Sequence, residues 1–225
     1  METFGDHRNP PGSDAQADGS DQRGAERLRL LMRTGKLVTS KGEFLCVLRD
    51  ASTTGFRAKI YHPLPDVGQM QLELASELRY DVEKVWENES EAGFRFEREI
   101  ELEELINELT PYPKRGVRLK LALDTSILVG VEKASAKIFN LSQQGARIKT
   151  SHPLARDQRL RLEIKGLRTV AAQVRWRNED TYGLVFDDTF RFDELALHAS
   201  RLQRTNGLHQ SGQDLSRNPQ IEAAG

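Results

Sequence analysis

The chain has 225 residues and a formal net charge of −1, with 30% charged and 37% hydrophobic residues. This length allows one large domain or two small ones, each with a modest core. The balanced charge excludes a global attraction to nucleic acid polymers or anionic membranes, so an anion site must be a local cluster of Arg or Lys.

Cysteine usage and the N-terminal sequence favour a reducing compartment. Cys46 is the single cysteine, so no internal disulfide can form. The first residues lack a basic region followed by an apolar run, so no signal peptide is expected. The sequence also lacks a run of about 18 apolar residues, the length of a membrane span. We therefore expect a cytoplasmic protein without membrane insertion.

The N-terminal half predicts a disordered segment followed by a domain. Residues 1–26 are rich in Gly, Pro, Asp, Ser and Gln and lack apolar periodicity, so we expect disorder there. A first domain is predicted over residues 27–109. Its run EFLCVLR, residues 43–49, predicts a strand buried on both faces, with Cys46 as a core thiol. The domain ends with a predicted helix, whose apolar residues follow the helical spacing Leu102, Leu105, Ile106 and Leu109.

The C-terminal half predicts a second domain. The segment TPYP, residues 110–113, breaks the helix and predicts a linker. The second domain covers residues 114–203, with apolar alternation that begins at Val117 and is typical of half-buried strands. Its final helix is predicted from the spacing of Phe192, Leu195, Ala196 and Ala199. Residues 204–225 are expected to form a disordered tail.

The two predicted domains repeat one sequence pattern at an offset of 90 residues. The motif Asp/Asn-x-Ser-x-x-Gly occurs at residues 50–55 and again at residues 140–145. The same offset relates two HPL tripeptides, VWENE to RWRNE, and GFRF to GLVF. Short strands separated by turns, with about 8–12 residues between them, favour antiparallel barrels. We therefore expect an all-β protein made of two tandem antiparallel β-barrels, each followed by a short C-terminal α-helix.

Polar residues before and within the first motif have the chemistry of a nucleotide site. Arg29 and Arg33 are four residues apart, and their guanidinium forks match phosphate and the O6/N7 edge of guanine. Asp50 can accept hydrogen bonds from guanine nitrogens, and Ser52 can donate or accept. Gly55 allows a sharp turn or a close backbone approach. A single turn of this type is usually structural, but its repetition after an arginine pair favours a ligand site.

The combined pattern resembles the PilZ domain, a bacterial family with many cyclic di-GMP receptors. It contains R-x-x-x-R, a strand pair, (D/N)-x-S-x-x-G, a strand ending in V-W or V-x-W, and G-x-x-F. The resemblance covers roughly residues 27–203 and implies six-stranded barrels in a tandem PilZ-domain protein. It also implies that cyclic di-GMP (c-di-GMP) is the ligand, without a further cofactor. In the family, the arginines lie in a flexible segment that wraps the ligand, and the turn receives a guanine.

Carried over by position, the resemblance implies two ligand sites of unequal completeness. The first copy has the full set Arg29, Arg33, Asp50, Ser52 and Gly55. The second has Lys114, Arg118, Asn140, Ser142 and Gly145, with Arg115 as a possible substitute for the first arginine. Because Lys lacks the bidentate fork of Arg, we expect the first copy to hold the ligand and the second to be a weaker site. Arg33 lies 17 residues before Asp50 and Arg118 lies 22 before Asn140, which predicts about five extra residues in the second copy.

The remaining conspicuous side chains are interpreted as structural. Trp86 and Trp176 have apolar neighbours and are expected in the barrel cores. His62 and His152 precede Pro in loops and lack partners at metal-ligand spacing. The sequence has no nucleophile with a base, no paired carboxylates and no Gly-rich phosphate loop, so we expect neither an enzyme nor a metal protein.

Several alternatives stay open at this point. Arg57 and Arg147 follow their motifs and are interpreted as exposed strand residues, with ligand contact as the alternative. A degenerate PilZ module that binds only another protein is the main alternative to a c-di-GMP receptor. A nucleic-acid-binding barrel is disfavoured by the near-neutral charge and the lack of an aromatic ladder. The sequence identifies neither the protein partner nor the controlled process.

Overall fold

The computed structural model describes residues 28–107 and 116–214. Side chains are described within residues 32–103, at Leu105 and within residues 116–203. The segment 1–26 and the linker 110–113, both predicted above, lie outside the described residues, as does the tail from residue 215 onward.

The first barrel is a closed antiparallel sheet with the strand order β1-β2-β3-β6-β5-β4. Its short strands alternate between core and surface; Phe56 and Ala58 of β3, for example, point inward and flank the exposed Arg57. The elements are β1 (Leu28–Thr39), β2 (Gly42–Ser52), β3 (Gly55–Lys59), β4 (Met70–Leu74), β5 (Arg79–Glu87), β6 (Glu91–Phe96) and then α1 (Leu102–Asn107).

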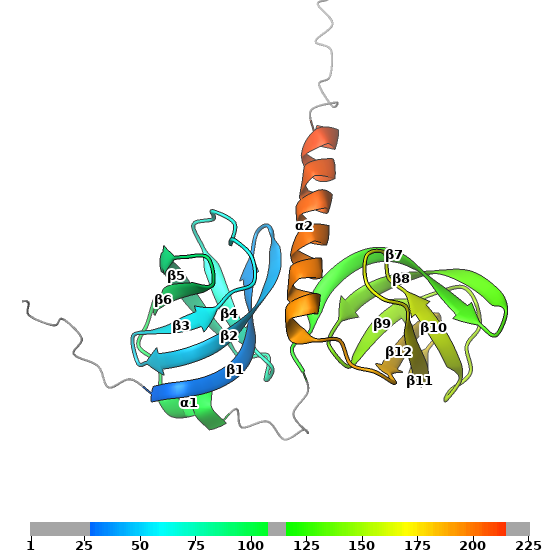
Figure 1. Cartoon of the computed structure of the whole chain (residues 1–225), viewed down its shortest axis with the longest axis horizontal. Coiled ribbons are helices and arrows are strands. Elements are labelled where there is room, and N and C mark those ends of the chain that lie inside the picture. The colour runs from blue at the N-terminus through cyan, green and yellow to red at the C-terminus, as the bar shows by residue number, and fades with distance from the viewer. Residues whose placement is uncertain (1–27, 108–115, 215–225) are drawn as a thin grey trace, which may run out of the picture.

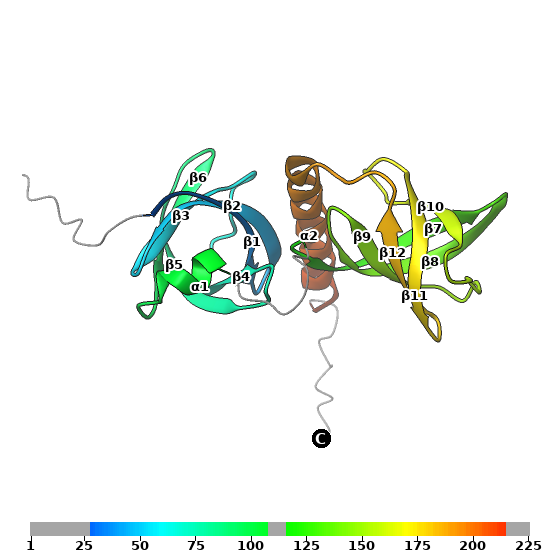
Figure 2. The ribbon, with the colours of Figure 1, turned by 90° about the horizontal axis from the view of Figure 1, so that it is seen from below.

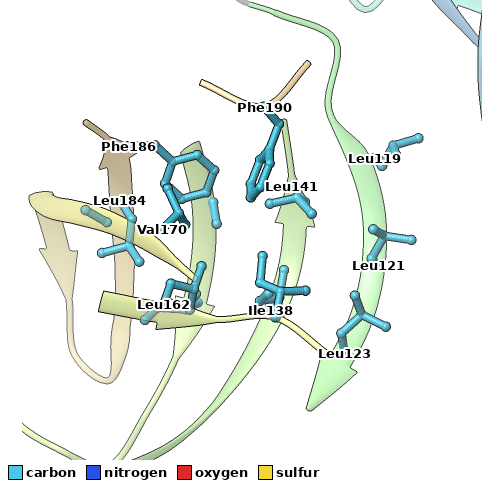
Figure 3. Packing of buried hydrophobic residues seen from close by; sticks show 14 of the residues in the cluster. Leu119, Leu121, Leu123, Ile138, Leu141, Leu162, Val170, Leu184, Phe186 and Phe190 are labelled. Carbon is cyan, nitrogen blue, oxygen red and sulfur yellow. The ribbon is translucent and has the colours of Figure 1, made fainter. Parts of the chain in front are cut away.

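The second barrel repeats this topology, with the order β7-β8-β9-β12-β11-β10. Its elements are β7 (Leu119–Val129), β8 (Glu132–Leu141), β9 (Gly145–Lys149), β10 (Arg159–Glu163), β11 (Val170–Asn178), β12 (Thr181–Phe186) and α2 (Phe192–Asp214). Aliphatic side chains from facing strands fill its interior, and Phe186 and Phe190 meet edge to face at one end (Figure 3). The prediction of two tandem six-stranded antiparallel barrels is confirmed.

The opening hairpins of the two barrels have matching positions. β1 ends at Thr39 and β2 begins at Gly42, while β7 ends at Val129 and β8 begins at Glu132. Both boundaries differ by the same 90 residues that relate the two motifs. The prediction of about five extra residues in the second copy is therefore wrong, because it took Arg33 as the counterpart of Arg118.

The two helices differ in length. α1 has six residues and buries Leu105 in the first core, as its apolar spacing predicts. α2 has 23 residues and continues to Asp214, beyond the predicted end of the domain at residue 203. Its buried residues Leu195, Ala196 and Ala199 belong to the second core. Neither helix in the described part of the chain is long and apolar enough to span a bilayer.

The barrels dock against each other through β2 and α2. Figure 1 and Figure 2 show α2 between the two barrels. Along β2, Phe44 and Cys46 point into the first core, whereas Leu45 between them joins the core of the second barrel. The prediction that this strand is buried on both faces is confirmed, and docking explains it. Cys46 is a core thiol as expected, and burial raises its pKa to about 12.

Candidate functional site

A row of paired residues crosses five strands of each barrel. In the first barrel, the backbone register joins Arg29, Asp50, Arg57, Gly93 and Trp86. In the second, it joins Lys120, Asn140, Arg147, Gly183 and Trp176. Residues that pair directly across strands share one face of a sheet. The duplicated motif is therefore part of a wider row. In each barrel, two strands separate the strand that carries the motif from the strand that carries the tryptophan.

Register shifts turn the tryptophans outward. β11 has an irregularity between Val174 and Trp176, where the pairing with β12 shifts by one residue. β5 shifts in the same way between Lys84 and Trp86. A bulge of this type interrupts the alternation of inward and outward side chains. The prediction that both tryptophans lie in the core is wrong: Trp86 is 43% exposed and Trp176 is 45% exposed.

Each tryptophan lies flat over a glycine of the neighbouring strand. A Cβ atom at Gly183 would stand 2.1 Å from the indole Nε1 of Trp176, and one at Gly93 would stand 2.0 Å from that of Trp86. Both contacts are shorter than van der Waals distance, so only glycine lets the indole rest on the sheet. The result is an exposed aromatic face, the shape on which a nucleobase stacks.

The Ser and Gly of the motif have structural roles in both copies. Ser142 donates from its backbone N–H, 2.9 Å, and from its hydroxyl, 3.1 Å, to the carbonyl of Gly145. Ser52 is likewise buried and donates to Gly55 O at 3.3 Å. A Cβ atom added to Gly55 would lie 2.3 Å from the backbone oxygen of Phe94. One added to Gly145 would lie 2.2 Å from the backbone oxygen of the equivalent residue, Leu184. The motif glycine is thus required by the close approach of the next strand.

The polar part of the first row is closed by ion pairs. Asp50 is buried, and its Oδ2 accepts hydrogen bonds from Arg57 Nε at 2.8 Å and pairs with Nη2 at 2.6 Å. The third nitrogen of Arg57 lies 3.1 Å from Glu91 Oε2. The hydrogen bond to Asp50 raises the pKa of Arg57. The prediction that Arg57 is an exposed strand residue is confirmed, but its charge is matched by two carboxylates.

The second row lines an open pocket of about 620 Å³. At the positions of the two carboxylates that bond Arg57 in the first barrel, this barrel has Asn140 in place of Asp50 and Thr181 in place of Glu91. Arg147 lies over the ring of Phe139, 5.9 Å from its centroid. The pocket walls include Arg118, Asn140, Ser142, Arg147, Arg175 and Trp176. The described residues that line this pocket include three arginines and no carboxylate, so it attracts an anion.

The predicted arginine pair of the first barrel lies inside β1. Arg29 pairs with Asp50 in the register, and its side chain lies outside the described residues. Arg33 is half-buried and pairs with the core residue Leu48. It stands four residues before Leu37, and strand alternation places both on the core-facing side of β1. Arg33 therefore projects from a different face of the sheet than the row.

The register also changes which arginines correspond in the two barrels. Lys120 pairs with Asn140 as Arg29 pairs with Asp50. Likewise, Leu123 pairs with Ile138 as Arg33 pairs with Leu48. Leu123 is therefore the counterpart of Arg33. Arg118, two residues before Lys120, corresponds instead to Arg27.

Counting back along the sequence from this register aligns Arg27 with Arg118 and Arg23 with Lys114, two arginines that the sequence analysis did not consider. Arg23 and Arg27 are four residues apart, as are Lys114 and Arg118. Arg27 lies 23 residues before Asp50, close to the 22 that separate Arg118 from Asn140 in the second copy. This spacing was the available signal. Arg23, Arg27, Lys114 and Arg115 lie outside the described residues.

His62 and His152 lie in loops without a described metal-ligand cluster. His62 is buried beside Phe44, with ring centroids 5.2 Å apart, and its Nδ1 lies 3.0 Å from Pro63 O. Both His62 and His152 lie in loops, as predicted. Within residues 28–107 and 116–214, no cluster of three or more His, Cys, Asp or Glu side chains is arranged to hold a metal ion.

Comparison with known proteins identifies the second barrel. Residues 114–200 match the family model described as the PilZ domain. The second barrel is therefore a PilZ domain, and the chain is a PilZ-domain protein. No curated protein sequence matches the chain significantly.

Solved structures of two-barrel length also match the chain at low identity. The PlzA protein of Borreliella burgdorferi in complex with c-di-GMP is 13% identical, with 79% of this chain and 93% of that chain covered and a TM-score of 0.35. The Bacillus subtilis inhibitor of motility MotI/DgrA is 14% identical, with 83% and 99% covered and a TM-score of 0.31. Escherichia coli YcgR in complex with c-di-GMP is 10% identical, with 82% and 87% covered and a TM-score of 0.26.

Proposed function

We propose that this protein is a non-enzymatic receptor for c-di-GMP and that its second barrel carries a ligand pocket. The observation that supports this most strongly is the cationic pocket of about 620 Å³, lined by three arginines, the motif Asn140 and the exposed face of Trp176. A cyclic dinucleotide presents two phosphates and two guanines. The pocket offers a matching group for each part of such a ligand.

The chemistry of the walls fits a purine nucleotide. Guanidinium forks bind phosphate oxygens or the O6/N7 edge of guanine. The amide of Asn140 can donate and accept hydrogen bonds at a guanine edge. The indole of Trp176 provides a stacking surface. The match of residues 114–200 to the PilZ domain supports the same ligand, because many members of that family bind c-di-GMP.

The first barrel remains a predicted ligand site of its own. Its motif residues Asp50, Ser52 and Gly55 are present, and Arg29 and Arg33 precede them. Because Asp50 is paired with Arg57, a ligand there must displace an existing ion pair. We therefore propose that the second barrel is the stronger site and that the first, predicted from its complete motif to hold most of the ligand, is the alternative.

An interaction role for the first barrel is supported by its docking face. Leu45 points out of the first barrel and packs in the core of the second. A module that has kept the barrel and lost the ligand needs such a face but no cationic pocket. We propose that ligand capture acts on the docked pair of barrels, and that the pair then changes its contact with a protein partner.

Calorimetric titration of the intact chain with c-di-GMP tests this function. We expect saturable binding at about micromolar concentration or tighter. Arg118→Ala should weaken binding by about tenfold or more, because a charge-assisted hydrogen bond is lost. Arg33→Ala, measured in parallel, should change the affinity less. A loss confined to Arg33→Ala would assign the ligand to the first barrel, and no heat from the wild type would overturn the receptor function.

A further inference from the structure

Lys36, a buried lysine of the first barrel, donates a hydrogen bond to the main chain of Arg118, which lines the second-barrel pocket. Lys36 is 1% exposed, and its ammonium has three N–H donors. Its Nζ lies 2.8 Å from Glu43 Oε2, 2.9 Å from Glu73 Oε1 and 2.8 Å from the carbonyl oxygen of Arg118. All three donors are therefore used, and one of them joins the first barrel to the residue that enters the second-barrel pocket.

The carboxylate of Glu43 holds the same stretch of main chain from a second point. Glu43 Oε2 accepts a hydrogen bond of 2.7 Å from the backbone N–H of Lys120, two residues beyond Arg118. β10 pairs with β7 further along, over Ser126–Leu128. At the start of β7, the charged pair of the first barrel thus bonds backbone groups that a neighbouring strand would otherwise satisfy.

Helix α2 completes this junction. Gln203 Oε1 accepts from the backbone N–H of Glu43 at 2.6 Å, and Gln203 Nε2 donates to Glu43 O at 2.7 Å. Gly42 has φ +130, and a Cβ atom there would lie 2.1 Å from Gln203 Oε1. Glycine is the residue that both adopts this backbone angle without strain and leaves room for the Gln203 side chain. The junction is therefore specific in geometry, and Leu45 seals its apolar side within the second core.

We propose that Lys36 and Glu43 of the first barrel are positioning residues for Arg118 in the second-barrel site. This inference rests on the proposed function. The flanks of Arg118, Val117 and Leu119, are buried in the second core, while its side chain is exposed at the pocket. Fixing the Arg118 carbonyl and the Lys120 N–H restricts the backbone on both sides of that side chain. A restricted backbone lowers the ordering cost of ligand binding.

The same contacts couple ligand capture to the docking of the barrels. If docking raises the affinity at Arg118, then ligand must favour the docked arrangement by the same factor, because the coupling free energy is reciprocal. The first barrel would in this way act on a site whose described lining residues all belong to the second. Replacing Lys36 should weaken c-di-GMP binding. It should also reduce the protection from hydrogen exchange that bound ligand gives to backbone amides at the junction.

The test compares two neighbouring variants of the intact chain. Lys36→Met removes the bond to Arg118. Arg79→Met instead removes the second cation paired with Glu73, 2.8 Å from Glu73 Oε2, and leaves the bonds of Lys36 in place. c-di-GMP affinity is measured by calorimetry, and exchange of the Lys120 amide hydrogen is measured without ligand. We expect Lys36→Met to bind about tenfold more weakly, as for the loss of one charge-assisted hydrogen bond, and to exchange this amide faster. Arg79→Met should match the wild type in both.

A third variant guards against misfolding of Lys36→Met. Gln203→Ala removes the helix contact from the partly exposed side of the junction and leaves the buried ion pair in place. It should weaken binding in the same direction by a smaller factor. Wild-type affinity and unchanged Lys120 exchange in both Lys36→Met and Gln203→Ala would overturn the inference and leave the receptor function standing. Absence of c-di-GMP binding by the wild type would instead overturn the proposed function.

Discussion

The two barrels share a strand order and a row of paired residues, but they differ in the charges along that row. In the first barrel, Asp50 and Glu91 bond to Arg57. In the second, Asn140 and Thr181 occupy the equivalent positions, and Arg147 lines an open pocket. Two carboxylates thus separate an ion-paired surface from a cationic one. The comparison shows that a complete motif does not by itself leave its polar groups available, because neighbouring side chains can pair with them.

The largest expected effect is one that the barrels should share. Gly55→Ala and Gly145→Ala each place a Cβ atom within 2.3 Å of a backbone oxygen on the next strand. Backbone cannot move aside without breaking the barrel, so we expect each change to lower the free energy of unfolding by about 3 kcal/mol. Chemical denaturation of the two variants measures this. Gly68→Ala is the control, since a Cβ atom there meets nothing within 4 Å.

A second prediction separates the barrels by their tryptophans. If the pocket of the second barrel holds a guanine, Trp176→Ala should weaken c-di-GMP binding by about 1–3 kcal/mol through the loss of base stacking. The same change at Trp86 should leave the affinity within about twofold, because that indole belongs to the row in which Arg57 is ion-paired. Calorimetric titration of both variants checks the comparison, and equal losses would contradict it.

The two arginines that follow the motifs should also differ, because Arg57 is ion-paired and the described contact of Arg147 is with the ring of Phe139. Arg57→Ala removes the partner of the buried Asp50 and should lower the free energy of unfolding by about 1–2 kcal/mol. Arg147→Ala should change this free energy by less than about 0.5 kcal/mol, since its described contact is with an exposed ring. In ligand titrations the order should reverse, with Arg147→Ala the weaker binder. A larger loss of stability in Arg147→Ala would show that the charge comparison is misplaced.

The smallest effect should come from His198, whose equivalent position in the first half of the chain is not a histidine. Burial on α2 lowers its pKa from the ordinary value of 6.5. The unfolded chain then binds this proton at a higher pH than the folded one, so stability is fully present above pH 6.5 and falls as the pH drops below it. We expect this pH-dependent contribution of His198 to the free energy of unfolding to be less than about 1 kcal/mol. Thermal unfolding of His198→Gln between pH 7 and 5 should show a flatter pH dependence than the wild type.

Sequence patterns predicted the architecture because each signal in one copy could be checked against the other. The offset of 90 residues linked motif, strand and helix signals in two copies, and the alternation that begins at Val117 identified inward residues of the second barrel. Alternation failed at Trp86 and Trp176, since a bulge reverses facing without leaving a mark in residue type. It also could not distinguish a strand buried by its own barrel from β2, which the second barrel covers.

The site was predicted only in part, for a related reason. Asn140, Ser142, Gly145 and Arg118 do line one pocket, as their motif suggests. Arg33 was grouped with Asp50 because four-residue spacing occurs more than once before β2, and spacing alone cannot select among the candidates. The strand register can, because it aligns Arg33 with Leu123. Contacts that depend on docking, such as Lys36 with Arg118, have no local sequence signal at all.

The central claim, that c-di-GMP binds the second barrel, is tested most directly by tryptophan fluorescence. The chain has two tryptophans, one on each row. In Trp86→Phe the remaining indole reports on the second barrel, and in Trp176→Phe it reports on the first. We predict that c-di-GMP quenches Trp86→Phe saturably, at the concentrations that saturate the calorimetric signal, and leaves Trp176→Phe nearly unchanged. Quenching confined to Trp176→Phe would contradict the account and place the ligand on the first barrel.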